Sequence, residues 1–214
     1  VLYRGYCFMS GDYSTNSINT ENSSQDPLFS EKVRDEAIMK VKTEFGKTAA
    51  DIGAGIGFMT EGLLNAGLNV IIVESSDDNI KFLKQRFGHF SEVQIVKSSL
   101  PKIDINDNSV DYIFSNMNLH DAVEPEQLIK EMHRLLRPGG KLAITDLSEH
   151  RFESFQKEHK HRWPGFNMPD LYEWFVKSGL KEITIEVLDH TVQTESSSGE
   201  SIKIGVFLAY GEKQ

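Results

Sequence analysis

Short apolar runs alternate with amphipathic stretches from residue 47 to residue 147. The runs predict strands, and the stretches between them repeat apolar positions at helical spacing. The predicted strands are 47–52, 69–74, 92–97, 110–115 and 141–147, and the predicted helices lie near 58–66, 77–87 and 125–137. Strands that alternate with helices predict an α/β fold, in which helices cover both faces of a mostly parallel sheet.

Further elements flank this block. Apolar positions at helical spacing predict a helix within residues 28–44, with Ser30 as its N-cap. Residues 168–179 predict another helix, which ends at a glycine. Two more strands are predicted at 181–188 and 202–210, and the polar stretch between them is long enough for a loose loop. We expect these two strands to complete the sheet as an antiparallel pair.

The N-terminal stretch differs from the rest in composition. Residues 10–26 are dominated by Ser, Asn, Thr and Asp, which bury little apolar surface. We therefore expect a flexible arm over residues 1–27 and one folded domain over residues 28–214. The length of 214 residues suits one domain with some decoration.

Charge and cysteine content disfavour several kinds of function. The chain has 23 Lys and Arg against 32 Asp and Glu, a formal net charge of −9, which disfavours binding to DNA or RNA. Cys7 is the one cysteine, so neither a disulfide framework nor a zinc site built from cysteines is expected. No apolar run reaches about 18 residues, so no membrane insertion is expected and the expected location is cytoplasmic.

The most informative segment is a glycine loop between a predicted strand and a predicted helix. Asp51 is followed by Gly53, Gly55 and Gly57, and glycines in this context let a nucleotide approach the backbone. The dinucleotide fingerprint needs its third glycine where this chain has Phe58. The pattern Asp-x-Gly-x-Gly-x-Gly instead resembles the first motif of class I S-adenosylmethionine (SAM)-dependent methyltransferases.

The second predicted strand ends in Glu74, which lies 21 residues after Gly53. A carboxylate at this strand end can accept hydrogen bonds from both ribose hydroxyls of an adenosine. The same acid suits NAD, so Glu74 favours a bound nucleotide without choosing between NAD and SAM.

Three later segments carry the resemblance further. Residues 106–115 (NDNSVDYIFS), 118–120 (NLH) and 135–142 (LLRPGGKL) resemble stretches found in the same order in small-molecule methyltransferases of the UbiE-like type. The resemblance covers about residues 28–210. It implies a Rossmann-like, seven-stranded, mostly parallel sheet with an antiparallel final strand. It also implies SAM as the cofactor, S-adenosylhomocysteine as the product and a small molecule as the methyl acceptor.

In this family the cofactor lies across the ends of the first, second and fourth strands. The cofactor-binding residues that the resemblance implies are Asp51, Gly53, Ala54, Gly55, Gly57, Glu74, Ser75, Ser99, Leu100, Asn116 and Met117. One departure concerns the adenine, because the family often has an acidic residue where this chain has Ser98-Ser99-Leu100.

Two histidines are the catalytic candidates. Methyl transfer from a sulfonium is an in-line displacement with a good leaving group, so no catalytic triad is required. His120, after the fourth predicted strand, is either a base or a histidine that holds a loop. His150, Trp163 and Phe166 belong to the pattern D-L-x-x-H and R-W-x-G-F, which resembles a lid over the acceptor pocket. All four residues are candidates for binding the acceptor.

A metal site and a cover for the cofactor are weaker possibilities. Glu158, His159 and His161 are close in sequence, but a His-x-His pair on a polar helix is usually solvated, so no metal is expected. Arsenite-type acceptors are disfavoured because the necessary thiols are missing. The residues considered for covering the cofactor are Tyr13, Phe29 and Arg34. Arg34 is either a partner for the methionine carboxylate or, with greater weight, a surface side chain.

Two other functions stay open. A nicotinamide-dependent oxidoreductase shares the strand-end acid but is disfavoured by Phe58 and Gly57. A SAM-binding regulatory protein without catalysis is not separated from an enzyme, because the chemistry needs few signature residues. The sequence leaves the acceptor atom and the oligomeric state undetermined.

Overall fold

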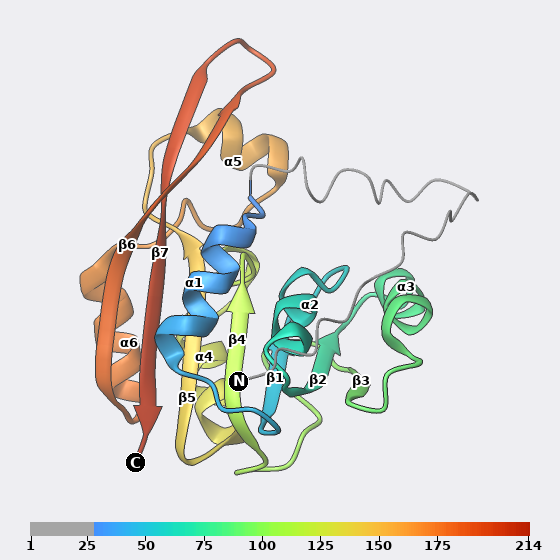
Figure 1. Ribbon diagram of the computed structural model, residues 1–214. Helices are drawn as coiled ribbons and strands as arrows, with labels where there is room; N and C mark the ends of the chain where they lie inside the picture. The colour runs from blue at the N-terminus through green and yellow to red at the C-terminus, as the bar shows by residue number, and fades with distance from the viewer. Residues whose placement is uncertain (1–27) are drawn as a thin grey trace.

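The computed structural model describes residues 28–214, which form one seven-stranded sheet with helices on both faces (Figure 1). The strands are β1 (Thr48–Ile52), β2 (Asn69–Glu74), β3 (Val93–Lys97), β4 (Val110–Asn116), β5 (Leu136–Leu147), β6 (Leu180–Glu195) and β7 (Ser201–Lys213). The helices are α1 (Glu31–Val41), α2 (Phe58–Asn65), α3 (Asp77–Phe87), η2 (Leu119–Asp121), α4 (Pro125–Leu135), α5 (Glu153–His159) and α6 (Met168–Ser178). The predicted arm, with Cys7 and Tyr13, lies outside the described residues.

The sheet confirms the predicted fold class. Its strand order is β3-β2-β1-β4-β5-β7-β6. β1 to β5 pair in parallel, whereas the final strand β7 is antiparallel to both β5 and β6. The order reverses between β1 and β4, and ligands of open α/β sheets bind at the carboxyl ends of the strands at such a point.

Two apolar clusters bury the faces of the sheet. α1, α2 and α3 cover one face, with Val33, Leu63 and Phe87 among their buried side chains. α4 and α6 cover the other face, where Met132 and Phe175 are fully buried. Figure 1 shows α1 and α2 in front of the sheet and α4 and α6 behind it. The helical periodicity therefore predicted the correct layers, and the Ser30 hydroxyl accepts the Val33 amide as the expected N-cap.

The largest differences from the predicted boundaries concern β5 and β6. β5 begins at Leu136 rather than at residue 141, because Leu136 already pairs with Val110 across a register shift. The predicted loose loop after β6 is instead paired ribbon out to Glu195. Val192 is buried on one face of this ribbon, and a short turn over 196–200 closes it.

Helix α5 was not predicted. It lies at the upper end of the sheet in Figure 1, below the tip of the β6–β7 ribbon. The Glu158 carboxylate accepts the Ser197 amide at 3.0 Å and the Ser197 hydroxyl at 2.6 Å, which ties α5 to the turn of the ribbon. These contacts span 39 residues, so local periodicity contained no sign of them.

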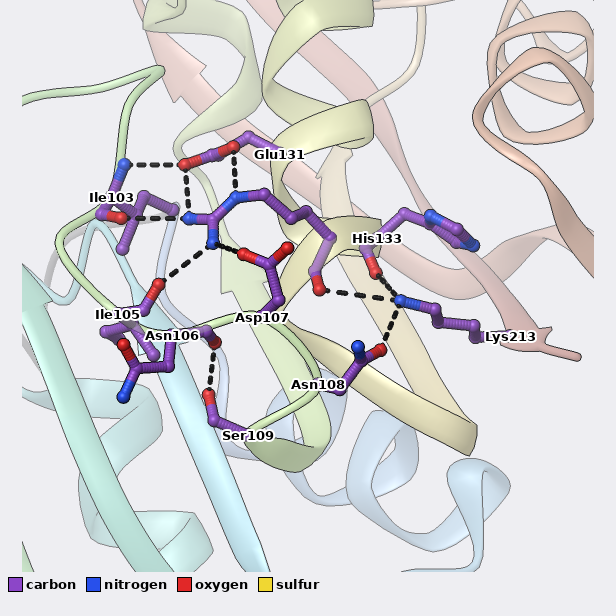
Figure 2. Close-up of polar contacts among 10 residues, drawn as sticks. Ile103, Ile105, Asn106, Asp107, Asn108, Ser109, Glu131, His133 and Lys213 are labelled. Atoms are coloured by element: carbon purple, nitrogen blue, oxygen red, sulfur yellow. Dashed lines mark hydrogen bonds and ion pairs between the residues drawn. The ribbon is translucent and has the colours of Figure 1, made fainter.

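Arg134 of α4 binds the loop between β3 and β4, and Figure 2 labels its partners Ile103, Ile105, Asp107 and Glu131. Its guanidinium donates to Glu131 and to the Ile103 and Ile105 carbonyls at 3.0 Å, and it pairs with Asp107. The loop between β3 and β4 is thereby fastened to α4, which fixes the start of β4. Within residues 28–214, no helix is both long and apolar enough to cross a membrane.

Candidate functional site

The glycine loop turns sharply between β1 and α2. Gly53, Gly55 and Gly57 have φ values of 71°, 57° and 87°, in the left-handed region that favours glycine. A Cβ atom on Gly57 would lie 2.3 Å from the Phe87 ring, and one on Gly53 would lie 2.3 Å from the Asn118 side chain. A Cβ on Gly55 would meet nothing within 4 Å. The outer two glycines are therefore required by packing, whereas Gly55 faces open space.

The Glu74 carboxylate holds this loop against the end of β2. One oxygen, Oε2, accepts the Gly55 amide at 2.8 Å. The other, Oε1, accepts the amides of Ser75 at 2.8 Å and Ser76 at 2.9 Å. The side chain is 8 % exposed, so the strand-end acid is a buried acceptor and not a solvated one. Since each carboxylate oxygen has two lone pairs, Oε2 keeps one acceptor position.

Asp51 lies at the base of the loop and is buried. Its Oδ2 accepts the Thr60 hydroxyl at 2.6 Å. Burial raises the pKa of the Asp51 carboxyl to about 7; the hydrogen bonds from Thr60 oppose this shift and the negative charge of Glu74 adds to it. Asp51 thus links β1 to α2 beneath the loop.

The segment after β4 lies opposite the glycine loop. Asn116 is buried, and its Oδ1 accepts the Thr145 hydroxyl at 2.6 Å. Met117 has φ of 49°, a strained backbone for a side chain of this size, and its amide donates to the Thr145 carbonyl at 2.9 Å. Asn118 packs against Gly53 and so joins the two loops. Sequence reasoning gave Asn118 no role, although it stands within a quoted motif.

His120 and Asp146 form a buried pair across the ends of β4 and β5. His120 Nδ1 lies 2.6 Å from Asp146 Oδ1. Asp146 also accepts the amides of Leu119, His120 and Leu147 at 2.7–3.2 Å. Burial lowers the pKa of the His120 imidazole, but Asp146 and Asp121 outweigh this effect, so the pKa lies above its ordinary value.

Asp146 was quoted in the sequence pattern without a role. The sequence feature that could have identified it is a carboxylate near the carboxyl end of β5. The strand ends of a parallel sheet converge at this position.

The predicted lid crosses the same end of the sheet. Its backbone pairs with the chain after β5, since the His150 amide donates to the Pro164 carbonyl and the Phe166 amide donates to the Leu147 carbonyl. The Trp163 indole donates to the Ala122 carbonyl at 2.8 Å. Phe166 is 3 % exposed and packs among the core residues of the α6 face, so its ring belongs to the core.

A group of histidines gathers beneath this segment. The rings of His120 and His161 lie 4.1 Å apart, and those of His159 and His161 lie 5.4 Å apart. Burial lowers the pKa of His161 to about 3, and the neighbouring histidines add to this effect. Burial also lowers the pKa of His150, with a contribution from the charge of His120. The second nitrogen of His150, Nε2, is buried and has no hydrogen-bond partner in this structure.

The remaining predicted residues are divided between the site and its surroundings. The amides of Gly53 and Ala54 donate to the Val73 carbonyl, at 3.0 and 3.2 Å. Ser99 is exposed after β3, and Leu100 packs on the core. The neighbouring Ser98 is buried, with its hydroxyl bound to the Lys102 carbonyl and the Asp104 amide.

The sequence favoured a surface position for the Arg34 side chain, and this prediction was wrong. Its side chain is 6 % exposed, lies against the Phe58 ring and faces Glu61 at 3.7 Å. Phe29 packs edge-on against the same Phe58 ring, with centroids 5.4 Å apart. The small Gly62 of α2 leaves the room that this packing needs. Arg34 therefore joins α1 to α2 beside the glycine loop, and a role toward a methionine carboxylate stays a prediction.

Comparison with known proteins gives a consistent result. Residues 50–144 match the family model described as a methyltransferase domain. A demethylmenaquinone methyltransferase of Renibacterium salmoninarum is 29 % identical over 111 residues, which are 52 % of this chain and 46 % of that protein. Phosphoethanolamine N-methyltransferase 1 of Triticum aestivum is 30 % identical over 148 residues, 66 % of this chain and 29 % of that protein. The chain thus spans less than half the length of these relatives.

Solved structures share the fold. The YcgJ protein of Bacillus subtilis superimposes with a TM-score of 0.70 at 14 % identity, covering 86 % of this chain and 99 % of that one. Phosphoethanolamine N-methyltransferase 2 of Haemonchus contortus, solved with phosphomonomethylethanolamine and S-adenosylhomocysteine, gives 0.71 at 17 % identity, covering 86 % of this chain and 53 % of that one. At these identities the likeness concerns the fold alone.

Proposed function

Because residues 50–144 match the family model of a methyltransferase domain, we propose that this chain is a class I SAM-dependent methyltransferase that binds SAM and transfers its methyl group to a small-molecule acceptor. The observation that carries this proposal is the bond between Gly55 and Glu74 at the point where the strand order reverses. It sets a buried carboxylate beside a glycine whose outer side is open.

The residues of the loop fit an adenosine. Oε2 of Glu74 keeps one acceptor position for a ribose hydroxyl, and a second hydroxyl would replace an amide now bound to Oε1. Gly55 offers room for close approach of a ligand, because no atom stands within 4 Å of the place a Cβ would take. We assign Asp51, Gly53 and Gly57 to the shape of the loop, beneath the ligand.

The cofactor would supply a methyl group on a positively charged sulfur, which is already a good leaving group. The protein then mainly has to hold the acceptor in line with the carbon–sulfur bond. We assign this task to the segment after β4, where Asn116 and Met117 are fixed by Thr145. Ser75, Ser99 and Leu100 stand at the ends of β2 and β3, where the adenine would lie.

His120 and His150 are assigned to the acceptor side. When His120 is neutral and its Nδ1 donates to Asp146, the lone pair of the ring is on Nε2. The lone pair can accept a proton or coordinate a cation. His150 Nδ1 accepts the Phe152 amide at 3.2 Å, so the unpartnered Nε2 of His150 carries a hydrogen that it can donate. The Trp163 amide donates a hydrogen bond to the His120 carbonyl at 3.0 Å, which holds Trp163 next to η2.

Binding of NAD is disfavoured by the start of α2. The third glycine of the dinucleotide fingerprint permits close packing of the helix. Phe58 stands there instead and packs between Phe29 and Arg34. The relatives named above take acceptors as different as a demethylmenaquinone and a phosphoethanolamine, so they support a small molecule as acceptor without selecting one.

Calorimetric titration of the purified chain tests the first part of the proposal. SAM should bind with a saturable heat, whereas NAD should give none. Binding of NAD without binding of SAM would overturn the assignment. Incubation with methyl-labelled SAM and fractionated metabolites tests the second part. Transfer of label to a small molecule is expected, and bound SAM with no transfer in any fraction would favour a regulatory protein without catalysis.

A further inference from the structure

Three side chains that offer metal ligands meet at the end of β4 and the start of the lid. They are His120 and Asp121 of η2 and His161, which follows α5. One ligand atom from each lies within 4.8 Å of the other two. His120 and His161 are 2 % and 8 % exposed, so His161, unlike the exposed His159, does not lie on the solvated helix face that the His-x-His sequence suggested.

The His120 ring is oriented as a metal ligand would be. Its Nδ1 hydrogen is bound by the buried Asp146 carboxylate at 2.6 Å, and its Nε2 faces Asp121 Oδ2 at 3.9 Å. Histidines that bind metals through one nitrogen almost always donate the other N–H to a carboxylate, a carbonyl or water. The pair of His120 and Asp146 has this arrangement.

His161 supplies the independent observation. His161 is more than nine-tenths buried. Its Nδ1 is buried with it and has no hydrogen-bond partner in this structure. A buried polar atom without a partner costs roughly 1–3 kcal/mol. Because the His161 ring lies 4.1 Å from the His120 ring and belongs to this cluster, a cation bound here through the unpartnered nitrogen would satisfy it.

We propose that His120 Nε2, His161 Nδ1 and the Asp121 carboxylate bind one divalent transition-metal ion of the zinc type. Two imidazoles and one carboxylate form a ligand set that suits zinc and that leaves coordination positions open. Zinc bonds of 2.0–2.2 Å in a tetrahedron require ligand atoms roughly 3.4 Å apart. Asp121 is half-exposed, so its side chain is free to rotate and shorten the 3.9 Å between its Oδ2 and His120 Nε2.

The open positions would face the acceptor side of the site. The segment after β4 runs from Met117 through His120, and His150, whose pKa is lowered by burial and by the charge of His120, has its Nε2 without a partner. An acceptor with an oxygen, nitrogen or sulfur donor could therefore occupy a position on the ion. This last step rests on the proposed methyl transfer, whereas the metal site itself does not.

Zinc titration of the untagged full chain, after chelation and dialysis, tests the site. Calorimetry and metal analysis should give one zinc per chain. Cobalt(II) should give visible absorption bands of a low-symmetry site when it replaces zinc. Asp121→Asn and His161→Ala should each weaken zinc binding by at least about tenfold, and Asp146→Asn by about 10- to 100-fold.

Two histidine variants are the controls. His89→Ala removes an exposed histidine after α3, and His159→Ala removes the ring next to His161 that is outside the ligand set. Both should bind zinc as the wild type does. Absence of saturable zinc binding, or equal binding by Asp121→Asn and the wild type, would overturn the site. A loss in His159→Ala equal to that in His161→Ala would overturn this ligand set.

Two further measurements keep the outcomes separate. Circular dichroism shows whether His161→Ala is folded, and if it is not, the half-exposed Asp121→Asn decides. SAM binding is measured on the same metal-free samples. Intact SAM binding without zinc binding would overturn the metal site and leave the proposed function standing. Zinc binding without SAM binding would overturn the proposed function and leave the metal site standing.

Discussion

The imidazole of His120 is held by the carboxylate of Asp146, with Nδ1 and Oδ1 2.6 Å apart and both side chains buried. The same carboxylate accepts three backbone amides at the ends of β4 and β5. Asp146 is therefore both the group that orients His120 and a structural anchor for the loop that follows β4. A change at Asp146 should affect the stability of the fold as well as the site.

We expect Asp146→Asn to lower the free energy of unfolding by about 2–4 kcal/mol, because one oxygen is lost and an amide hydrogen meets buried donors. Urea unfolding followed by circular dichroism measures the change. Asp121→Asn, which alters a half-exposed acid on the same short helix, is the control and should change stability by less than about 0.5 kcal/mol. Equal effects of the two substitutions would contradict the anchoring role.

Glu74→Ala should weaken SAM binding by about 1–3 kcal/mol, since polar partners on the loop and the ligand lose their acceptor. Calorimetry measures the affinity. Glu74→Gln keeps the shape and one acceptor oxygen, so it should lose less than the alanine variant. Glu92→Ala changes an exposed acid just before β3 and should bind SAM normally. An unchanged affinity in Glu74→Ala would remove Glu74 from the site.

Much of the fold could be predicted from the sequence because it depends on local patterns. β2 and α3 occupy the predicted residues, since apolar runs and helical spacing are properties of short segments. The paired end of the β6–β7 ribbon and helix α5 could not be predicted, because contacts such as Glu158 with Ser197 join residues far apart in sequence. Burial of Arg34 is a similar case, since it depends on the space beside Gly62.

The same distinction between local patterns and long-range contacts applies to the candidate site. The glycine loop and Glu74 could be proposed as site residues from the sequence, because their spacing is fixed by one strand–turn–helix unit and its neighbour. The pairing of Asp146 with His120 was missed, and His161 was grouped with Glu158 and His159 instead of His120, because these contacts come from the convergence of β4, β5 and the lid. Phe166 was assigned to the acceptor pocket from a motif; its ring packs with the core of the α6 face, and the pocket role stays a prediction. A motif names residues, but only packing decides which way each side chain faces.

Arg134→Ala should lower the free energy of unfolding by about 1–3 kcal/mol, because the guanidinium joins α4 to the β3–β4 loop (Figure 2). Arg134→Lys should lose nearly as much, since an ammonium cannot reproduce the planar fork that binds Glu131 and two carbonyls. Denaturant unfolding measures both. Lys130→Ala breaks one exposed pair with Glu126 and should cost less than about 0.5 kcal/mol. Full stability of Arg134→Lys would show that charge alone suffices.

Asp51→Asn should make stability less dependent on pH. The carboxyl has an ordinary pKa of 3.8 and a pKa of about 7 in the fold, so the folded state binds the proton more tightly. Its contribution to stability therefore falls as pH rises from about 4 to 7, and the penalty is complete above the folded pKa. Unfolding measured from pH 4 to pH 8 should show the Asn variant gaining on the wild type by up to about 4 kcal/mol. If the difference in the free energy of unfolding between the two proteins does not change with pH, the raised pKa of Asp51 is contradicted.

Substitution of two glycines should separate the packing of the loop from its ligand. Gly57→Ala places a Cβ 2.3 Å from the Phe87 ring at a φ of 87°, so it should lower the free energy of unfolding by about 2–4 kcal/mol. Gly55→Ala has open space around its Cβ and should cost only about 1 kcal/mol, the strain of the left-handed backbone. If SAM lies over Gly55, however, this methyl group occupies the place of the ligand. Calorimetry should then show a larger loss of SAM affinity in Gly55→Ala than its small loss of stability explains. Normal SAM binding by a folded Gly55→Ala protein would place the ligand elsewhere.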